Sequence, residues 1–352
     1  MAEDLVQSAV EGRLGIITLN RPKALNALNL AMVEQIDAVL AGWETDPAID
    51  AVLIRSAVER AFCAGGDVRS IGILPEAGER EALARAFFGT EYRLNHRINR
   101  FPKPYIALIN GIAMGGGLGL SIHGSHRIVS ETVRMAMPET VLGLFPDVGG
   151  TWFLHRCPGA VGRYLALIGP QIGAADALAA GLATHHVPGT SFPALIADLV
   201  GMLRIDEAVL EAIIARHATV PEQGALAARI ADIDRLFGVS DLDLLVEGIR
   251  AEAPSEIWVA EAAGVLERAS PTSLKVTWQR MIDGAGQTIE RVLQDDYRIA
   301  VRIVQNHDFV EGVRAILVDK DHAPEWCPAQ IADVKEADIE GLLAPLEDEL
   351  PL

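Results

Sequence analysis

Apolar and polar positions follow two different patterns in the first half of the chain. Three short aliphatic runs, Leu14–Leu19, Ala51–Ser56 and Tyr105–Ile109, have the length and composition of buried strands. Between the first two runs, apolar residues recur at helical spacing, at Val33, Ile36, Leu40 and Trp43. Asn29 is a good N-cap for that helix, and Asp46-Pro47 ends it. The pattern therefore predicts the order strand, helix, strand.

Glycine and proline mark the corners between the elements that follow. One glycine corner lies at Phe62-Cys63-Ala64-Gly65-Gly66-Asp67 and a second at Gly115-Gly116-Gly117. Residues 76–100 are dense in Ala, Leu and Arg and are predicted to be helical, as are residues 117–123 after the second corner. Short extended pieces are expected at residues 127–130 and Arg134–Ala136. This succession predicts an α/β protein, built either as a coiled stack of ββα turns or as an α/β sheet.

The chain beyond Ser191 reads as almost entirely helical. The predicted helices cover residues 193–203, 206–217, 222–237, 242–251, 255–270, 273–282, 288–306 and 309–318. We expect a boundary near Gly189, which separates a core that holds the active site (residues 1–189) from a mainly helical region (residues 190–352). The acidic end from Ile331 to Leu352 is expected to be solvated.

Composition limits the class of partner. The chain has 352 residues and a net charge of −18, which argues against nucleic-acid binding because phosphate contacts need clustered Lys and Arg. Three widely spaced cysteines, Cys63, Cys157 and Cys327, form neither a disulfide framework nor a zinc motif and favour a reducing compartment. The first residues lack an apolar leader, and no apolar run approaches the roughly 18 residues of a membrane span. We expect a soluble, cytoplasmic protein.

The second glycine corner is the first candidate for chemistry. Three adjacent glycines allow close packing of a helix on a strand, which is one interpretation. The other is a helix N-terminus whose free N–H groups face an oxyanion, and this is the interpretation we prefer because three glycines are costly at a helix start. A dinucleotide fingerprint does not fit, because Leu120 stands where GxGxxG requires glycine.

Three acids are candidates for general acid or base chemistry. Glu139 precedes an apolar run, and a carboxyl group among apolar neighbours tends to have a raised pKa, although it could also be an ordinary acid at a helix N-terminus. Asp147 follows Pro146 and could instead cap the next helix. Glu91 lies inside a predicted helix, where a solvated face is the default. From the sequence alone, neither interpretation is preferred for any of the three.

Other reactive residues have weaker support. Cys63, beside Ala64 and Gly65, is better explained by packing than as a nucleophile. Ser121 nearly matches the G-x-S-x-G elbow of serine hydrolases, but the last position is His123 and the serine lies inside the predicted helix. His123 and His126 are spaced three residues apart without an intervening acid of the HExxH kind, so a packing or surface role is preferred to a metal site.

Three stretches together resemble the crotonase (enoyl-CoA hydratase/isomerase) superfamily. They run from Asn20 through Leu28, from Phe62 through Asp67 and from Gly111 through Gly117. The resemblance implies an α/β fold made of a spiral of ββα turns with a helical C-terminal region, and an activity on acyl-CoA thioesters. It implies that the backbone N–H groups of Gly66 and Gly116 form the oxyanion hole.

Some residues of this chain differ from those of an ordinary hydratase, and these differences indicate which group of the superfamily the chain resembles. A hydratase carries its first catalytic glutamate where this chain has Gly119, and its second matches Glu139. The chain is instead similar to the 3-hydroxyisobutyryl-CoA hydrolases of the superfamily. The residues that carry this similarity are Met137-Pro138-Glu139-Thr140, Gly143 through Gly150, Ser270 through Lys275, and His307-Asp308-Phe309. The similarity covers nearly the whole chain.

The resemblance also implies roles for single residues. It implies hydrolysis of 3-hydroxyisobutyryl-CoA and related 3-hydroxyacyl-CoAs to the hydroxy acid and free CoA, a step of valine breakdown. Glu139 would activate water or attack the carbonyl carbon, Asp147 would bind the 3-hydroxyl or shuttle a proton, and Glu91 would hold the acyl group. The other substrate-binding residues would be Ala24, Leu25, Asp67, Val68 and Arg69.

No cofactor and no metal is expected, since CoA belongs to the substrate. The only expected partner is the acyl-CoA, and a homo-oligomer is left open. Two alternatives remain at this point: a hydratase or isomerase that works with Glu139 alone, and a non-catalytic acyl-CoA-binding protein.

Overall fold

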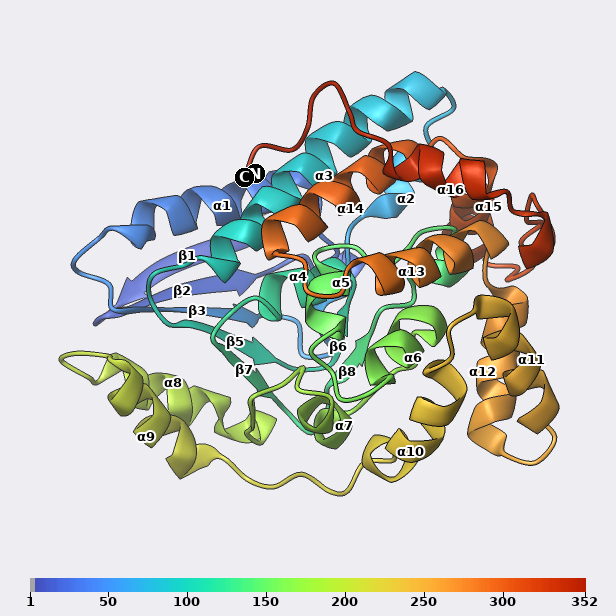
Figure 1. Cartoon of the computed structure of the whole chain (residues 1–352). Coiled ribbons are helices and arrows are strands. Elements are labelled where there is room, and N and C mark those ends of the chain that lie inside the picture. The colour runs from blue at the N-terminus through green and yellow to red at the C-terminus, as the bar shows by residue number, and fades with distance from the viewer. Residues whose placement is uncertain (1–3) are drawn as a thin grey trace. The chain divides into compact units, whose positions relative to one another are not determined.

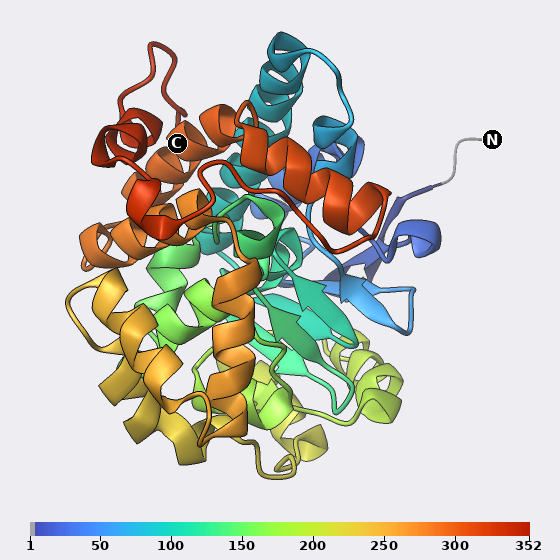
Figure 2. The same cartoon turned by 90° about the vertical axis from the view of Figure 1, so that its right-hand side faces the viewer.

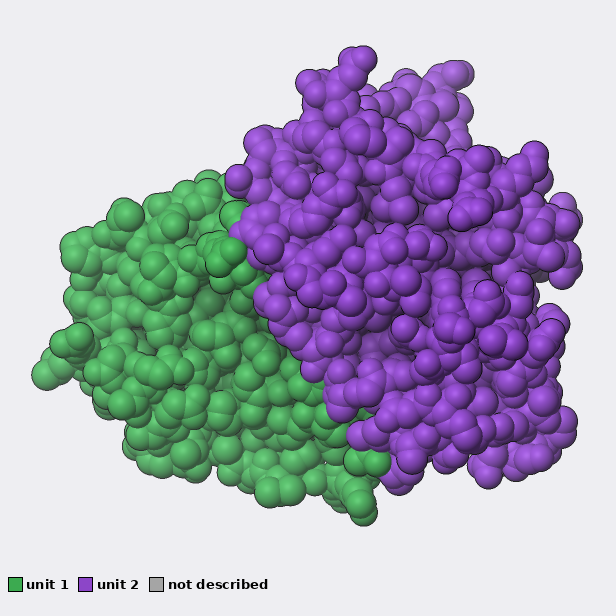
Figure 3. Space-filling model, viewed as in Figure 1, with its two compact units in different colours: residues 1–66, 93–136, 171–227 green, residues 67–92, 137–170, 228–352 purple. Residues whose placement is uncertain are grey.

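The computed structural model describes residues 4–352, which divide into two compact units (Figure 3). Unit 1 comprises residues 1–66, 93–136 and 171–227, and unit 2 comprises residues 67–92, 137–170 and 228–352. Each unit contains residues from before and after Gly189, so this division is of a different kind from the predicted one. The boundary near Gly189 stays a prediction. The expected lack of a leader concerns in part residues 1–3, which lie outside the described residues.

The strands of the described residues all lie in unit 1, and six of them form the larger sheet. They are β1 (Val6–Glu11), β2 (Leu14–Leu19), β3 (Ala51–Ser56), β5 (Tyr105–Ile109), β7 (His126–Val129) and β9 (His185–His186), in the order β1-β2-β3-β5-β7-β9. β1 pairs antiparallel with β2, and each later pairing in this sheet is parallel. The three aliphatic runs predicted as strands are confirmed as β2, β3 and β5. Parallel strands covered on both faces need apolar residues at every position, which is why these runs do not alternate.

Helices cover both faces of this sheet (Figure 1). α1 (Leu30–Glu44) packs on one face, where a Cβ on Gly15 of β2 would lie only 2.6 Å from the ring of Trp43. α8 (Phe192–Val200) and α9 (Glu207–His217) pack on the other, together with Leu14 and Ile16 of the same strand. The Asn29 side chain accepts a hydrogen bond from Met32 N, so the predicted cap of α1 is confirmed.

β1 is the element of the larger sheet that the sequence pattern misses. Only Val6 among its residues is buried, and the others are exposed. An antiparallel edge strand has one neighbour and little cover, so its sequence lacks the apolar run that identifies a central strand.

A second, smaller sheet carries the glycine corners. It consists of β4 (Ala61–Cys63), β6 (Ile112–Met114) and β8 (Arg134–Ala136), all parallel. β8 was predicted as an extended piece, whereas β6 is too short for its apolar period to be recognised. α4 (Gly116–Ser121) starts directly after β6, so the small-residue helix predicted at the second corner is confirmed with slightly shifted ends.

Unit 2 is mainly helical within the described residues. It contains α2 (Val68–Gly72), α5 (Gly150–Leu154), α6 (Val161–Ile168), α11 (Leu242–Glu252), α12 (Ile257–Arg268), α13 (Pro271–Asp283), α14 (Ile289–Ile303), α15 (His307–Val313) and α16 (Glu336–Leu343). α3 (Ala77–Asn99) and α10 (Leu226–Phe237) contribute residues to both units. α11 and α12 lie side by side, in yellow and orange in Figure 2. The run of helices predicted for the second half of the chain is confirmed.

Side-chain caps set where three of these helices begin. Asp241 caps α11, Ser270 caps α13 and Thr288 caps α14, each by accepting a hydrogen bond from a backbone N–H of the first turn. Pro271 occupies the first position of α13, where its missing N–H costs nothing. Among residues 4–352, no helix is both long enough and apolar enough to cross a bilayer.

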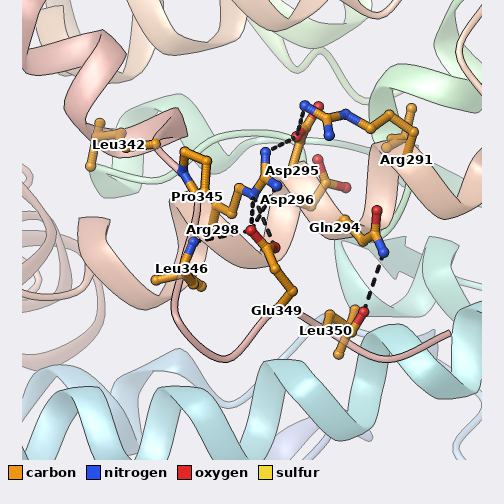
Figure 4. A network of polar contacts seen from close by, with 12 residues as sticks. Arg291, Gln294, Asp295, Asp296, Arg298, Leu342, Pro345, Leu346, Glu349 and Leu350 are labelled. Atoms are coloured by element: carbon orange, nitrogen blue, oxygen red, sulfur yellow. Dashed lines mark hydrogen bonds and ion pairs between the residues drawn. The ribbon is translucent and has the colours of Figure 1, made fainter.

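The acidic end of the chain is fixed to α14 through Glu349 (Figure 4), so the prediction of a solvated end holds for the exposed Glu347 and Asp348 but not for the half-buried Glu349. The Glu349 carboxylate accepts hydrogen bonds from Arg298 Nη2 at 2.6 Å and from Arg298 Nε at 2.9 Å. Arg298 also donates to Asp295 at 3.1 Å, and the following Leu350 is 2% exposed. The sequence could not single out Glu349 from its neighbours, because it does not show the arginine that pairs with it.

Replacing Glu349 by Gln should destabilise unit 2 only above acidic pH. The hydrogen bond from Arg298 is the first cause that lowers the pKa of Glu349. A lowered folded-state pKa contributes stability above the unfolded pKa, about 4.3, and loses it as pH falls through the folded value. At pH 7 we expect Glu349→Gln to lose roughly 0.5–1 kcal/mol of unfolding free energy, measured by urea titration.

Glu347→Gln is the matched control, because Glu347 lies in the same segment with an exposed side chain. It should leave stability unchanged at either pH. An equal loss in both variants, or a loss in Glu349→Gln that persists near pH 3, would show that the ion pair with Arg298 is not what holds the segment.

Candidate active site

The loop after β2 is tied to the first glycine corner by one buried asparagine. Ala24 ends a 3-10 turn (Pro22–Ala24), and Leu25 and Asn26 then adopt positive φ angles of 50° and 57°. The buried Asn26 side chain donates to Ser56 Oγ at 2.7 Å and to Phe62 O at 2.9 Å. Asparagine tolerates the left-handed conformation that such a turn requires. Ala24 and Leu25 are thereby held, half-buried, beside the corner.

The first glycine corner is bonded to the loop after β2 and lies close to the second corner within unit 1. Leu25 O accepts from Ala64 N at 3.0 Å, and Gly65 O accepts from Leu28 N at 2.8 Å. Gly65 has φ +111°, and a Cβ placed on it would lie 3.9 Å from Gly116 N. Only glycine adopts this φ without strain, so Gly65 permits the approach of the two corners.

Gly66 and Gly116 each offer a backbone donor there. Gly116 is the first residue of α4, where an N–H has no acceptor within its own helix. In the described part of unit 1, no backbone carbonyl accepts a hydrogen bond from Gly66 N or Gly116 N. Two such donors, close in space, are what an oxyanion hole requires.

Gly117 shows that the packing interpretation of the glycine triplet also holds. A Cβ on Gly117 would lie 2.3 Å from Cys63 O and 3.0 Å from the Cys63 Cβ. Gly117 is therefore required for close packing of α4 on β4, while Gly116 supplies the free N–H. The two interpretations of this corner apply to different glycines.

The next three implied substrate-binding residues lie at the start of α2, in unit 2. Asp67 is at the N-cap position without a capping side-chain bond, and Val68 and Arg69 are in the first turn. Asp67 and Val68 are half-buried, and Arg69 is exposed.

The three candidate acids all lie in unit 2, and of the two alternatives left open for Glu91 the solvated helix face is ruled out. Glu91 is 2% exposed, although it lies inside the long helix α3. Its Oε1 has no hydrogen-bond partner in the described part of unit 2. Burial raises the pKa of Glu91 well above its ordinary value, and the nearby charge of Asp147 raises it further.

Tyr92, the next residue of α3, holds Asp147. Its buried hydroxyl donates a hydrogen bond of 2.6 Å to Asp147 Oδ2. Burial raises the pKa of Asp147 to about 6, and the hydrogen bond from Tyr92 limits the rise because it favours the ionised form. Asp147 therefore changes charge close to neutral pH, which suits a proton shuttle.

Glu139 begins a short 3-10 turn (Glu139–Leu142) and is 6% exposed. Its Oε2 lacks a hydrogen-bond partner among the described residues of unit 2. Burial raises the pKa of Glu139 well above its ordinary value, with a further contribution from the charge of Asp147. A buried carboxyl group near a second one can exchange a proton near neutral pH, and the raised pKa predicted for Glu139 is confirmed in direction.

A strained loop presents Asp147. Val148 has φ +49°, which is unfavourable for a β-branched residue, and Gly149 follows at φ +78°. Gly149 N donates to Asp296 Oδ2 of α14 at 2.9 Å. The alternative that Asp147 caps the next helix is wrong: α5 has Gly149 at its N-cap and no side-chain cap.

Sequence reasoning missed Tyr92 and Asp296. Asp296 is fully buried, and burial raises its pKa to about 7 although Arg280 opposes the rise. Arg280 pairs with Asp295 at 2.9 Å and with Asp296 at 3.4 Å. The sequence feature that could have pointed to Asp296 as a buried acid is the adjacent pair Asp295-Asp296 inside an amphipathic helix. Tyr92 gave none beyond its position next to Glu91.

Two alternative nucleophiles are excluded by their surroundings. Ser121 Oγ is buried and donates to Gly117 O at 3.0 Å within its own helix. Cys63 Sγ is buried and contacts Asn26 O at 3.1 Å. Both side chains serve the packing of unit 1, as expected for Cys63.

Comparison with known proteins identifies the family. The model of the Enoyl-CoA hydratase/isomerase family matches residues 14–343. A protein named 3-hydroxyisobutyryl-CoA hydrolase, mitochondrial, from Xenopus tropicalis is 42% identical over 95% of this chain and 87% of its own length. The human protein of the same name is 40% identical over 94% of this chain and 86% of its own length. The chain belongs to the enoyl-CoA hydratase/isomerase (crotonase) family, so the resemblance seen in the sequence is confirmed.

Solved structures confirm the fold. A carnitinyl-CoA dehydratase from Mycobacterium thermoresistibile is 39% identical with a TM-score of 0.92, and the match covers 99% of both chains. An enoyl-CoA hydratase from Rhodobacter sphaeroides is also 39% identical, with a TM-score of 0.89 over 99% of this chain and 100% of its own. The chain has the α/β crotonase fold, with two sheets and a helical C-terminal region.

Removal of the Tyr92 hydroxyl should shift the titration of Asp147 upwards. The hydrogen bond stabilises the ionised carboxylate, so Tyr92→Phe should move the pKa of Asp147 above about 6. The shift is measured by carbon-detected NMR of labelled aspartate carboxyls, with the Asp147 signal assigned by its loss in Asp147→Asn.

Tyr105→Phe is the control, because its buried hydroxyl donates instead to Leu120 O, at 3.1 Å in unit 1. That variant should leave the Asp147 titration in place. An unchanged titration in Tyr92→Phe would mean that Tyr92 does not stabilise the Asp147 carboxylate.

Proposed function

We propose that the protein hydrolyses the thioester of 3-hydroxyisobutyryl-CoA, and of related 3-hydroxyacyl-CoAs, to the hydroxy acid and free CoA. The observation that carries the proposal is the buried Glu139 with the half-buried Asp147 near it, both with raised pKa, combined with Gly119 at the position where a hydratase has its first glutamate. Relatives about 40% identical over most of the chain bear the name of this hydrolase.

The carbonyl oxygen of the thioester would accept hydrogen bonds from Gly66 N and Gly116 N. As the carbonyl carbon becomes tetrahedral, its oxygen gains charge, and preorganised N–H donors stabilise that charge more than they stabilise the ground state. One such donor contributes about 3–4 kcal/mol to the transition state in comparable sites. The geometry that supports this role is the close approach of Gly65 to Gly116.

Glu139 would either deprotonate the attacking water or attack the carbonyl carbon itself, with later hydrolysis of the anhydride. In both routes its carboxylate form is needed, and burial makes that form more basic than an exposed glutamate. Asp147 would bind the 3-hydroxyl or accept a proton near neutral pH, as its pKa of about 6 allows. The thiolate of CoA leaves when the tetrahedral intermediate collapses, and it takes up a proton. In the route with direct attack, water then cleaves the anhydride, which releases the hydroxy acid and regenerates the Glu139 carboxylate.

Glu91 would hold the acyl group, since it lies next to the tyrosine that holds Asp147 and is buried without a partner for Oε1 in unit 2. Ala24 and Leu25 would contact the CoA part of the substrate through the loop that Asn26 fixes. Asp67, Val68 and Arg69 would bind the substrate at the start of α2, where helix N–H groups favour negative charge.

A hydratase or isomerase activity is the second candidate, because the two solved structures with the highest similarity named above are titled as a dehydratase and a hydratase. Gly119 argues against it, since hydration across a double bond would then rely on Glu139 alone. A non-catalytic acyl-CoA-binding protein is the third, and the retained Glu139 and Asp147 argue against that.

The pathway and the compartment are part of the proposal. Hydrolysis of 3-hydroxyisobutyryl-CoA is a step of valine breakdown. We propose a cytoplasmic location, supported by three free cysteines. The relatives named above are mitochondrial by their names. A homo-oligomer stays open.

Glu139→Gln should abolish turnover while acyl-CoA binding is kept. Gln has the same shape but neither the basicity nor the nucleophilicity of a carboxylate, so kcat should fall by at least roughly 10²–10⁴-fold. Binding is measured by calorimetry with the substrate, which the variant does not consume, and turnover by release of free thiol. Glu267→Gln, at an exposed glutamate of unit 2, is the control and should retain full turnover.

The substrate decides between the candidate functions. We expect release of free thiol from 3-hydroxyisobutyryl-CoA and little loss of the enoyl absorbance of crotonyl-CoA. Fast hydration of crotonyl-CoA without thiol release would replace the proposal by the hydratase. Binding of acyl-CoA without either reaction would replace it by a carrier.

A further inference from the structure

A group of histidine and glutamate side chains lies in unit 1, and none of them has a role in the proposed reaction. His126 Nε2 is 3.1 Å from Glu211 Oε1 and 3.5 Å from Glu207 Oε1. His185 Nε2 is 3.4 Å from Glu211 Oε2. His126 is 2% exposed, while both glutamate side chains open to solvent. The group thus joins a buried imidazole to two accessible carboxylates.

Parallel pairing of β7 and β9 brings the two histidines together. His185 pairs with Ile128, which lies two residues after His126, so both imidazoles stand on the same face of the sheet. Their rings are stacked, with centroids 6.2 Å apart. Glu207 and Glu211 are one turn apart on α9, which covers this face, and therefore point the same way.

Each histidine is oriented by a hydroxyl group on its other nitrogen. Ser125 Oγ lies 2.9 Å from His126 Nδ1, and Thr184 Oγ1 lies 3.0 Å from His185 Nδ1. With Nδ1 engaged, each ring directs Nε2 at the carboxylates. Metal-binding histidines are commonly held in this way, because the second nitrogen then fixes the ring orientation and the tautomer.

The spacing of the donor atoms fits a small divalent ion. In a tetrahedral zinc site with ligand bonds of about 2.0–2.1 Å, neighbouring ligand atoms lie about 3.3 Å apart. The two distances from His126 Nε2, 3.1 and 3.5 Å, bracket that value. The potential ligand atoms of His126, Glu207 and Glu211 all lie within 4.8 Å of one another, so a small movement of the exposed glutamate side chains brings all three within reach of one ion.

We propose that His126, Glu207 and Glu211 bind one divalent transition-metal ion of the Zn²⁺ class, with His185 holding the second oxygen of Glu211. The site would fasten α9 to the edge of the larger sheet and would have no part in thioester chemistry. This proposed metal site differs from the sequence analysis, which expected no metal. It also pairs His126 with acids distant in sequence, where the sequence had considered only His123.

The competing explanation is a hydrogen-bonded pair of His126 and Glu211 without an ion. The two differ in whether a metal binds with defined stoichiometry. The test is calorimetric titration of metal-stripped protein with ZnCl₂, repeated with Co²⁺, whose visible absorption is intense when it is tetrahedral. The wild-type protein is compared with the double variant E207Q/E211Q, which keeps the size of two exposed side chains and so keeps the fold.

We expect one Zn²⁺ per chain in the wild-type protein, with at least tenfold weaker binding in E207Q/E211Q and loss of the intense Co²⁺ bands. Glu34→Gln changes an exposed glutamate on α1 in the same unit and should bind Zn²⁺ as the wild-type protein does. Equal Zn²⁺ affinity in the wild-type protein and E207Q/E211Q would overturn the proposal. So would the lack of saturable binding in the wild-type protein, which would leave the hydrogen-bonded pair as the explanation.

Discussion

A buried carboxyl group, Glu139, with the half-buried Asp147 near it is the constraint that the rest of unit 2 accommodates. Desolvation raises the pKa of both Glu139 and Asp147, and the charge of Asp147 further raises the pKa of Glu139 and of Glu91. A protein stable by only about 5–15 kcal/mol bears such a cost only where the surrounding structure holds the groups in place. The hydrogen bond of 2.6 Å from Tyr92 to Asp147 is the most direct of these supports.

The supports extend far along the chain. The strained turn at Val148 is anchored where Gly149 N donates to Asp296. Arg280 forms an ion pair with Asp296 and so compensates its negative charge. The helix that carries Asp296, α14, also binds the end of the chain through the hydrogen bond from Arg298 to Glu349 (Figure 4). Residues of α13 and α14 thereby help to hold the loop that presents Asp147. This gives a physical reason for the length of chain that follows the sheets.

The sequence predicted what depends on local patterns. β2, β3 and β5 were recognisable because central parallel strands are apolar at every position, and α1 because Asn29 caps a periodic segment. β1 and β6 were missed, one because it is an exposed edge and the other because it has three residues. The two glycine corners and the acids at Glu139 and Asp147 could be chosen from the sequence.

The residues that contact these corners and acids could not be chosen from the sequence. The burial of Glu91, the role of Tyr92 and the fixation of the acidic end all depend on long-range packing, which leaves no period in the sequence. The histidines show the same limit: spacing suggested His126 with His123, whereas strand pairing brings it to His185 and to the glutamates of α9. The type of a residue indicates which chemistry it can perform, but strand pairing and helix packing decide which residues lie beside it.

The unfolding free energy of wild-type protein and Asp147→Asn, measured by urea titration from pH 4 to pH 8, tests the central claim. The pKa of Asp147 is raised to about 6 in the folded state, so the stability linked to its protonated form is present at low pH and lost as pH rises through 6. Asn keeps the acceptor for Tyr92 and carries no charge. We predict a variant more stable than the wild-type protein by roughly 1–2 kcal/mol at pH 8, with the gain vanishing towards pH 4. A variant that is less stable at pH 8, or a difference independent of pH, would contradict the account.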